Sequence, residues 1–173
     1  MRTAKPHVAP FVGPHWYVAA AWLVAALIAQ STVLHALAIH NVVPSVVLVV
    51  VVWYAIRVDA PRAALFGLFA GLCEDVLSPQ SGGAWTISTT LVAVLAGMLS
   101  RGFFADSLPL VCTIVAFATL VRSLLFWTVM GFEGYPPGLG AMHFREALLQ
   151  AVMNVAVMLV AMLVVRRVEA SSA

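Results

Sequence analysis

The sequence predicts an all-α membrane protein, a bundle of six transmembrane helices with both termini in the cytoplasm. Of the 173 residues, 63% are hydrophobic and only 9% are charged, and the mean hydropathy is +1.03, so the chain has too little polar surface to coat a soluble globule. Its apolar runs approach the about 20 residues that a helix needs to cross the hydrocarbon. These runs are continuous and lack the strict alternation of barrel strands, which favours helices that satisfy their own backbone in lipid. The whole chain, residues 1–173, is expected to form a single integral membrane domain.

The expected spans follow one another with short connectors: residues 16–38, 42–57, 62–78, 84–100, 107–131 and 144–165. Of the nine Lys and Arg residues, seven fall on one side of this topology: Arg2, Lys5, Arg57, Arg62, Arg101, Arg166 and Arg167. Because basic residues are enriched in cytoplasmic loops, this distribution places both termini in the cytoplasm.

The first two spans are defined mainly by their apolar character. The run that begins at Trp16 exceeds the roughly 7–15 residues of a signal-peptide core, so we expect an uncleaved first span. The second span carries the run Val46 to Val52 and has no polar face. We therefore expect the second span to be the most lipid-exposed helix, with a mainly structural role.

The third span has one small-residue face, which Glu74 and Asp75 continue toward the outer end. Its opposite face is formed by Leu65, Phe69, Leu72 and Val76. Gly67 and Gly71 form the G-x-x-x-G spacing that lets two helix backbones approach closely. An ionised carboxylate in hydrocarbon costs several kcal/mol, so we expect both acidic side chains to point inward.

The fourth span also has a face of small residues. Thr86, Thr90, Ala93, Gly97 and Ser100 lie on one stripe, and Ala93 and Gly97 form a second pair of small residues at four-residue spacing. Spans three and four are therefore expected to pack together through Gly67, Gly71, Ala93 and Gly97.

The fifth span carries a basic residue, Arg122, in the outer half of the membrane. It lies roughly 24 Å along the helix from Asp106, at about 1.5 Å per residue. An arginine at this depth must pair, snorkel or face water, and a bridge to Asp75 or Glu74 would offset two burial costs at once. The segment 131–140, GFEGYPPGLG, cannot continue a helix and is expected to form the longest outer loop, a connector or a lid.

The sixth span presents a polar stripe. It opens with His143, Arg145 and Glu146, and Gln150 and Asn154 continue the Glu146 face at four-residue spacing. Together with Gln30 and His35 in span one, the stripe outlines a cavity open to the outer side, and the candidate binding or partner residues are Glu74, Asp75, Arg122, Glu146, Gln150 and Asn154. Each of these groups also has a structural interpretation. The charged cluster could only hold the helices together, Gln150 and Asn154 could form interhelical hydrogen bonds, and the tryptophans could anchor the helices at the membrane surface.

Several functional classes are disfavoured by the sequence. An intramembrane aspartyl protease needs two aspartates from different helices, but only Asp75 is deep, because Asp59 and Asp106 lie in turns on the opposite side. No H-E-x-x-H helix is present, and the five histidines are scattered, so we expect no metal, no cofactor and no enzyme activity. Cys73 and Cys112 fall in apolar segments and read as small hydrophobes. A net charge of +2, with basic residues at span ends, argues against nucleic acid.

Residues 67–101 carry a recognisable pattern. Its positions are Gly67, Gly71, Leu72, Asp75, Ser78, then Gly82 or Gly83, and Ala96, Gly97 and Arg101, preceded by Pro44, Trp53-Tyr54-Ala55 and Arg57. This pattern resembles the signature region of the MreD family of bacterial rod shape-determining membrane proteins. In that family, G-x-x-x-G-L-x-x-D-x-x-S is followed by a Gly-containing turn and a span that ends A-G-x-x-x-R.

The resemblance implies a noncatalytic scaffold subunit of the elongation complex, which builds peptidoglycan in rod-shaped bacteria, located in the cytoplasmic (inner) membrane. Its partner would be MreC, through the transmembrane and juxtamembrane parts of MreC, with links to MreB, to RodA and to its penicillin-binding transpeptidase. The family also resembles the substrate-binding S component of energy-coupling-factor vitamin transporters, which are six-helix bundles with an outward-facing pocket. An S-type component, with Glu74, Asp75, Arg122 and Glu146 holding a polar ligand, is therefore the alternative.

Overall fold

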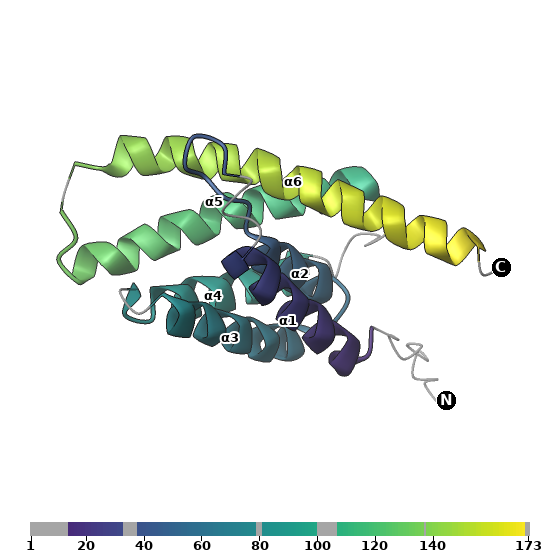
Figure 1. The fold of residues 1–173 in the computed structure, drawn as a ribbon. Helices are drawn as coiled ribbons and strands as arrows, with labels where there is room; N and C mark the ends of the chain where they lie inside the picture. The colour runs from purple at the N-terminus through teal and green to yellow at the C-terminus, as the bar shows by residue number, and fades with distance from the viewer. Residues whose placement is uncertain (1–13, 33–37, 79–80, 100–106, 137, 172–173) are drawn as a thin grey trace, which may run out of the picture.

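The computed structural model describes residues 14–32, 38–78, 81–99, 107–136 and 138–171, apart from the side chains of 165–166 and 168–171. Within these ranges the chain forms six helices and no strand, which confirms the all-α prediction. The helices are α1 (Trp16–Thr32), α2 (Val46–Ala55), α3 (Ala60–Leu77), α4 (Ala84–Leu99), α5 (Leu108–Phe132) and α6 (Gly140–Ser171). α5 and α6 lie beside the group formed by α1 to α4 and diverge toward the loop that joins them, and α1 begins at the end of the molecule where α6 finishes (Figure 1).

Local sequence explains most helix boundaries. Ser45 caps α2, because its hydroxyl accepts a hydrogen bond from the N–H of Leu48 at 3.3 Å. Pro61 and Pro109 stand in the first turns of α3 and α5, where a missing N–H costs nothing. The expected end of the first span at residue 38 lies past the described end of α1, and residues 33–37 are outside the described ranges.

Two of the described helices are long and apolar enough to cross a membrane. These are α5, with 25 residues and a mean hydropathy of 2.0, and the stretch Gly140–Val164 of α6, with 25 residues and 2.3. α1, α2 and α4 are apolar but shorter, and α3 has 18 residues and carries Arg62, Glu74 and Asp75. Length and composition thus support membrane-spanning helices in α5 and α6.

α3 and α4 form the most extensive helix pair, and glycine makes their close approach possible. A Cβ atom added to Gly71 would lie 2.6 Å from the Cα of Thr86, and one added to Gly67 would lie 2.6 Å from the Cβ of Ala93. Gly97 packs in the same way against Ala63, at 3.2 Å. The four small residues named from the sequence therefore all lie at this contact.

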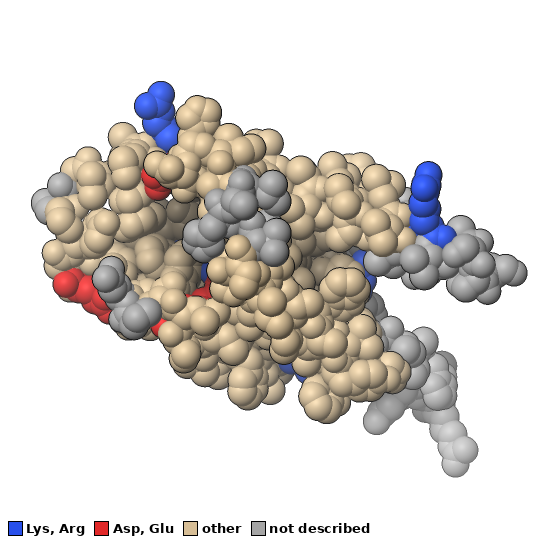
Figure 2. Space-filling model, viewed as in Figure 1, with Lys and Arg blue, Asp and Glu red and all other residues tan. Residues whose placement is uncertain are grey.

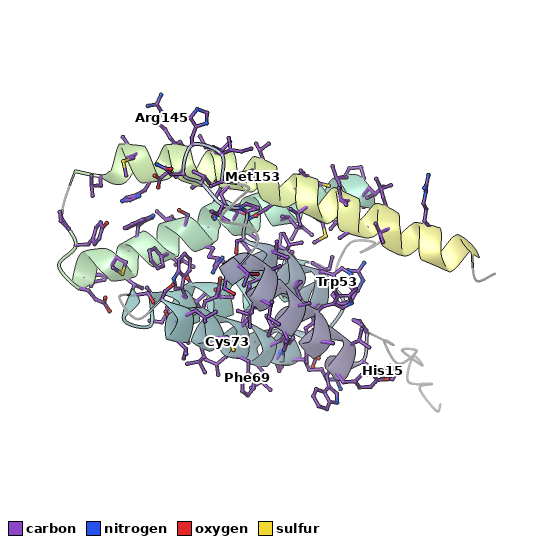
Figure 3. All side chains as sticks on the ribbon, viewed as in Figure 1. His15, Trp53, Phe69, Cys73, Arg145 and Met153 are labelled. Carbon is purple, nitrogen blue, oxygen red and sulfur yellow. The ribbon has the colours of Figure 1, made fainter. Side chains whose placement is uncertain are left out.

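α2 is the central helix, which overturns the expectation that it is the most lipid-exposed. It contacts α1, α3, α4, α5 and α6, and seven of its ten residues are buried. A helix without a polar face fits a protein core as well as it fits lipid, and its sequence does not distinguish the two. By contrast, the expected outward face of α3 is exposed, and Phe69 on that face projects away from the bundle (Figure 3).

Candidate functional site

A cavity of about 560 Å³ opens between the α5–α6 pair and the ends of α1 and α3. Its lining residues come from every helix except α2, whose N-cap supplies one more: Leu27, Gln30, Ser31, Asn41, Val42, Val43, Pro44, Ser45, Glu74, Leu77, Ser78, Trp85, Arg122, Ser123, Phe126, Trp127, His143, Glu146, Ala147 and Gln150. Figure 2 looks into this hollow, and both acidic and basic atoms are visible at its floor. The volume lies within the range of about 300–1,000 Å³ typical of small-molecule pockets.

The floor of the cavity is a buried ion pair between α3 and α5. Arg122 Nη2 donates to Glu74 Oε2 at 2.5 Å, and the two side chains are only 4% and 7% exposed. The predicted bridge from Arg122 is therefore present, and its acidic member is Glu74 rather than Asp75. Each charge offsets the burial cost of the other.

Arg122 also holds two further elements through its remaining nitrogens. Its Nε donates to Thr89 Oγ1 of α4 at 3.0 Å, and its Nη1 donates to the hydroxyl of Ser45 at 2.8 Å. The guanidinium carbon lies 4.4 Å from the ring centre of Trp85, a cation–π contact. Thr89 in turn donates to Glu74 at 3.3 Å, which closes a ring of polar contacts.

The network extends to α1 and α6. Asn154 of α6 accepts the backbone N–H of Ser45 at 2.7 Å and donates to Thr119 of α5 at 3.0 Å. Gln30 of α1 donates to Glu74 and accepts the N–H of Val47. Side chains from α1, α3, α4, α5 and α6 and the cap of α2 thus meet in one hydrogen-bonded cluster, which we call the Arg122 cluster.

Asp75 has a different role from its neighbour Glu74. It does not line the cavity; its carboxylate faces the start of α4, where Oδ2 accepts from the N–H and the hydroxyl of Thr86 at 2.8 and 2.5 Å. Oδ1 accepts from the hydroxyl of Ser81 at 2.6 Å and from the N–H of Trp85 at 3.2 Å. Asp75 therefore acts as a cap that joins the C-terminal end of α3 to the first N–H groups of α4.

Aromatic rings form another part of the cavity lining, beside Arg122 and His143. Trp85 stacks on Phe126 with ring centres 4.0 Å apart, and Trp127 stacks on His143 at 3.3 Å. His143 is 8% exposed, and its Nδ1 lies 3.3 Å from a carboxylate oxygen of Glu146. Its Nε2 is buried and has no hydrogen-bond partner within the described part of the chain.

The other residues expected at the site divide between the cavity and its surroundings. Glu146 and Gln150 line it, and Gln150 also donates to the carbonyl of Val43 at 2.9 Å. Asn154 lies in the Arg122 cluster and does not line the cavity. Arg145 points away from the bundle (Figure 3), and His35 lies outside the described residues.

Several site residues were not predicted. Trp85 and Trp127 were interpreted as membrane anchors but line the cavity, because a helical wheel gives a side chain's direction without identifying the helix opposite. Thr89 was not predicted because the packing stripe of the fourth span passes through Thr86 and Thr90 and leaves Thr89 beside it. Ser45 carried a usable signal, since Ser after Pro and before an apolar run is a typical N-cap.

The carboxylates of Glu74 and Asp75 are both engaged within the protein. The Glu74 carboxylate is held by Arg122 and Thr89, and the Asp75 carboxylate is held by the α4 N-terminus, so neither is free to act on a substrate. No group of three or more His, Cys, Asp or Glu side chains able to hold a metal ion occurs in the described ranges. Comparison with known proteins found no match, whether to protein families, to curated proteins or to solved structures.

Proposed function

We propose that this chain is a noncatalytic subunit of the bacterial elongation complex that spans the cytoplasmic membrane six times and acts as a scaffold for MreC. The proposal rests on the MreD-like pattern. The supporting observation is that the residues of the pattern serve one structural purpose, since Gly67, Gly71 and Gly97 lie in the α3–α4 contact and Asp75 caps the turn between the two helices.

Surface chemistry supports a location in the bilayer. Large apolar side chains are exposed along the outer faces of several helices, including Phe69 and Val76 of α3, Leu124 of α5 and Val160 of α6, at 62–80%. Apolar exposure on this scale is unusual for a soluble monomer and typical of a surface that another apolar phase covers. The position of the first turn of α1 and the last turn of α6 at one end of the molecule fits an even number of crossings (Figure 1).

Within this proposal the cavity receives a segment of MreC. The polar groups at the floor of the cavity are already hydrogen-bonded to one another. An incoming segment therefore needs to supply partners only for the other polar groups of the lining. The second candidate, an S-type ligand-binding component, is favoured by one observation: the buried Nε2 of His143 beside the cavity has no described partner, which suits a small polar ligand.

Co-purification from native membranes tests the scaffold proposal. Ala147 lines the cavity and is 5% exposed, so Ala147→Trp should fill the cavity and deplete an MreC-like single-span coiled-coil protein from the complex. Ala141 is exposed on the same helix, so Ala141→Trp is the matched control and should retain the partner. An ATPase pair with a coupling subunit in place of that protein would contradict the scaffold and support the transporter component.

A further inference from the structure

One face of α6 lines the cavity with polar side chains. His143, Glu146 and Gln150 lie three and four residues apart, so they share this face, and all three line the cavity. Gln150 uses its amide N–H group on the carbonyl of Val43, so its side-chain oxygen remains as an acceptor. Glu146 contributes a carboxylate whose side chain is 42% exposed and therefore reachable from the open side.

His143 adds an acceptor through its tautomer. An ionised carboxylate only accepts hydrogen bonds, so the contact between His143 Nδ1 and Glu146 assigns the proton to Nδ1. In the neutral ring Nε2 then carries a lone pair, and this atom is buried without a partner in the described part of the chain. A buried acceptor of this kind is normally satisfied. Because Nε2 is covered in this structure, a donor in the cavity reaches it only when the His143 ring turns toward the opening.

The charges of the cavity wall favour a positive occupant. Among the described lining residues Arg122 contributes one positive charge, and Glu74 and Glu146 contribute two negative charges, which leaves one net negative charge with His143 neutral. Arg122 is paired with Glu74, so the unbalanced charge is that of Glu146. The neighbouring wall of Phe126 and Trp127 suits the apolar part of the same occupant.

We propose that His143, Glu146 and Gln150 form a site for a cationic group with several N–H donors, a guanidinium or an ammonium. This inference rests on the proposed binding role of the cavity and specifies its chemistry. The cation comes either from a basic side chain of the partner segment or from a free organic cation, and both sources present the same chemistry to α6.

The test uses the full chain purified in detergent and two capped amino acids of the same length, one with a charged guanidinium and one with a neutral urea. N-acetyl-arginine amide should raise the melting temperature and change tryptophan fluorescence in a saturable way, and the uncharged N-acetyl-citrulline amide should not. Glu146→Gln should weaken arginine binding about tenfold or more, because the negative charge is removed and a hydrogen bond between two charged groups is replaced by a weaker one. Glu133→Gln removes an exposed carboxylate outside the cavity and should leave the affinity unchanged.

Equal responses to the two compounds, or equal affinities in Glu146→Gln and Glu133→Gln, would overturn the inference. Retained co-purification of MreC alongside such a result would show that the cation site fails while the scaffold stands. To distinguish the two sources, a photoreactive residue at Ser123 would be crosslinked in native membranes. A captured peptide with Arg or Lys at the crosslink identifies the partner, and a stoichiometric organic cation released on denaturation identifies a free ligand. A neutral or acidic occupant in either experiment would contradict the proposal.

Discussion

Replacing Arg122 with Met leaves the Glu74 carboxylate buried without its cation. The Glu74 side chain is 7% exposed, so little water contacts it in place of the guanidinium, and Ser45 and Thr89 lose a donor at the same time. Breaking a buried ion pair by removing one member costs about 3–5 kcal/mol. We therefore expect Arg122→Met to lower the free energy of unfolding by about that amount.

Removing both charges should cost much less. In the double variant Glu74→Leu/Arg122→Met no uncompensated charge remains, and apolar replacement of a buried pair is often close to neutral. The exposed pair Arg62–Asp59 is the matched control, since its side chains are 70% and 51% exposed and its nitrogen and oxygen lie 3.4 Å apart. A double-mutant cycle on that surface pair should give a coupling energy of less than about 1 kcal/mol.

Both cycles can be measured by reversible unfolding in mixed micelles, followed by circular dichroism. The buried-pair explanation is refuted if the effects of the Glu74 and Arg122 substitutions simply add, or if their coupling energy does not exceed that of the Arg62–Asp59 pair.

Three further variants test other parts of the fold. Gly71→Ala should lower the melting temperature by several degrees, because its Cβ would meet the α4 backbone at 2.6–2.8 Å. In the control Gly131→Ala the added Cβ has nothing within 4 Å, so this variant should melt like the parent. Similar melting of the two variants would argue against tight α3–α4 packing. Asp75→Asn turns an amide donor toward groups that themselves donate and should cost about 1–2 kcal/mol in the same unfolding assay. Unchanged stability would show that Asp75 is not a cap. Asn154→Leu leaves the N–H of Ser45 without this acceptor and should cost about 1–3 kcal/mol, and a neutral result would indicate that water replaces the amide.

The sequence predicted two kinds of contact best: those between neighbouring helices and those that keep a buried charge from being unpaired. The α3–α4 hairpin follows from Gly67, Gly71, Ala93 and Gly97, because small residues at four-residue spacing allow close backbone approach. The pairing of Arg122 with a neighbouring acid follows from burial cost, since neither charge is stable alone in an apolar interior.

Longer-range features were less predictable. A uniformly apolar sequence does not show whether lipid or protein surrounds the helix, so the central position of α2 was not predicted. The choice between Glu74 and Asp75 depended on where the first turn of α4 lies, because that turn supplies the donors that engage Asp75. The aromatic wall depended on helix neighbours, which bring Trp127 against His143.

The order in which the chain is made gives the Arg122 cluster a further significance. Glu74 precedes Arg122 by 48 residues, so the ribosome completes the acid and the whole of α4 before it reaches the base. Asn154, which anchors Ser45 from α6, comes later still. The cluster is therefore closed only when α6 has emerged, and a nascent or truncated chain that stops before α5 retains a carboxylate with no counter-ion from Arg122.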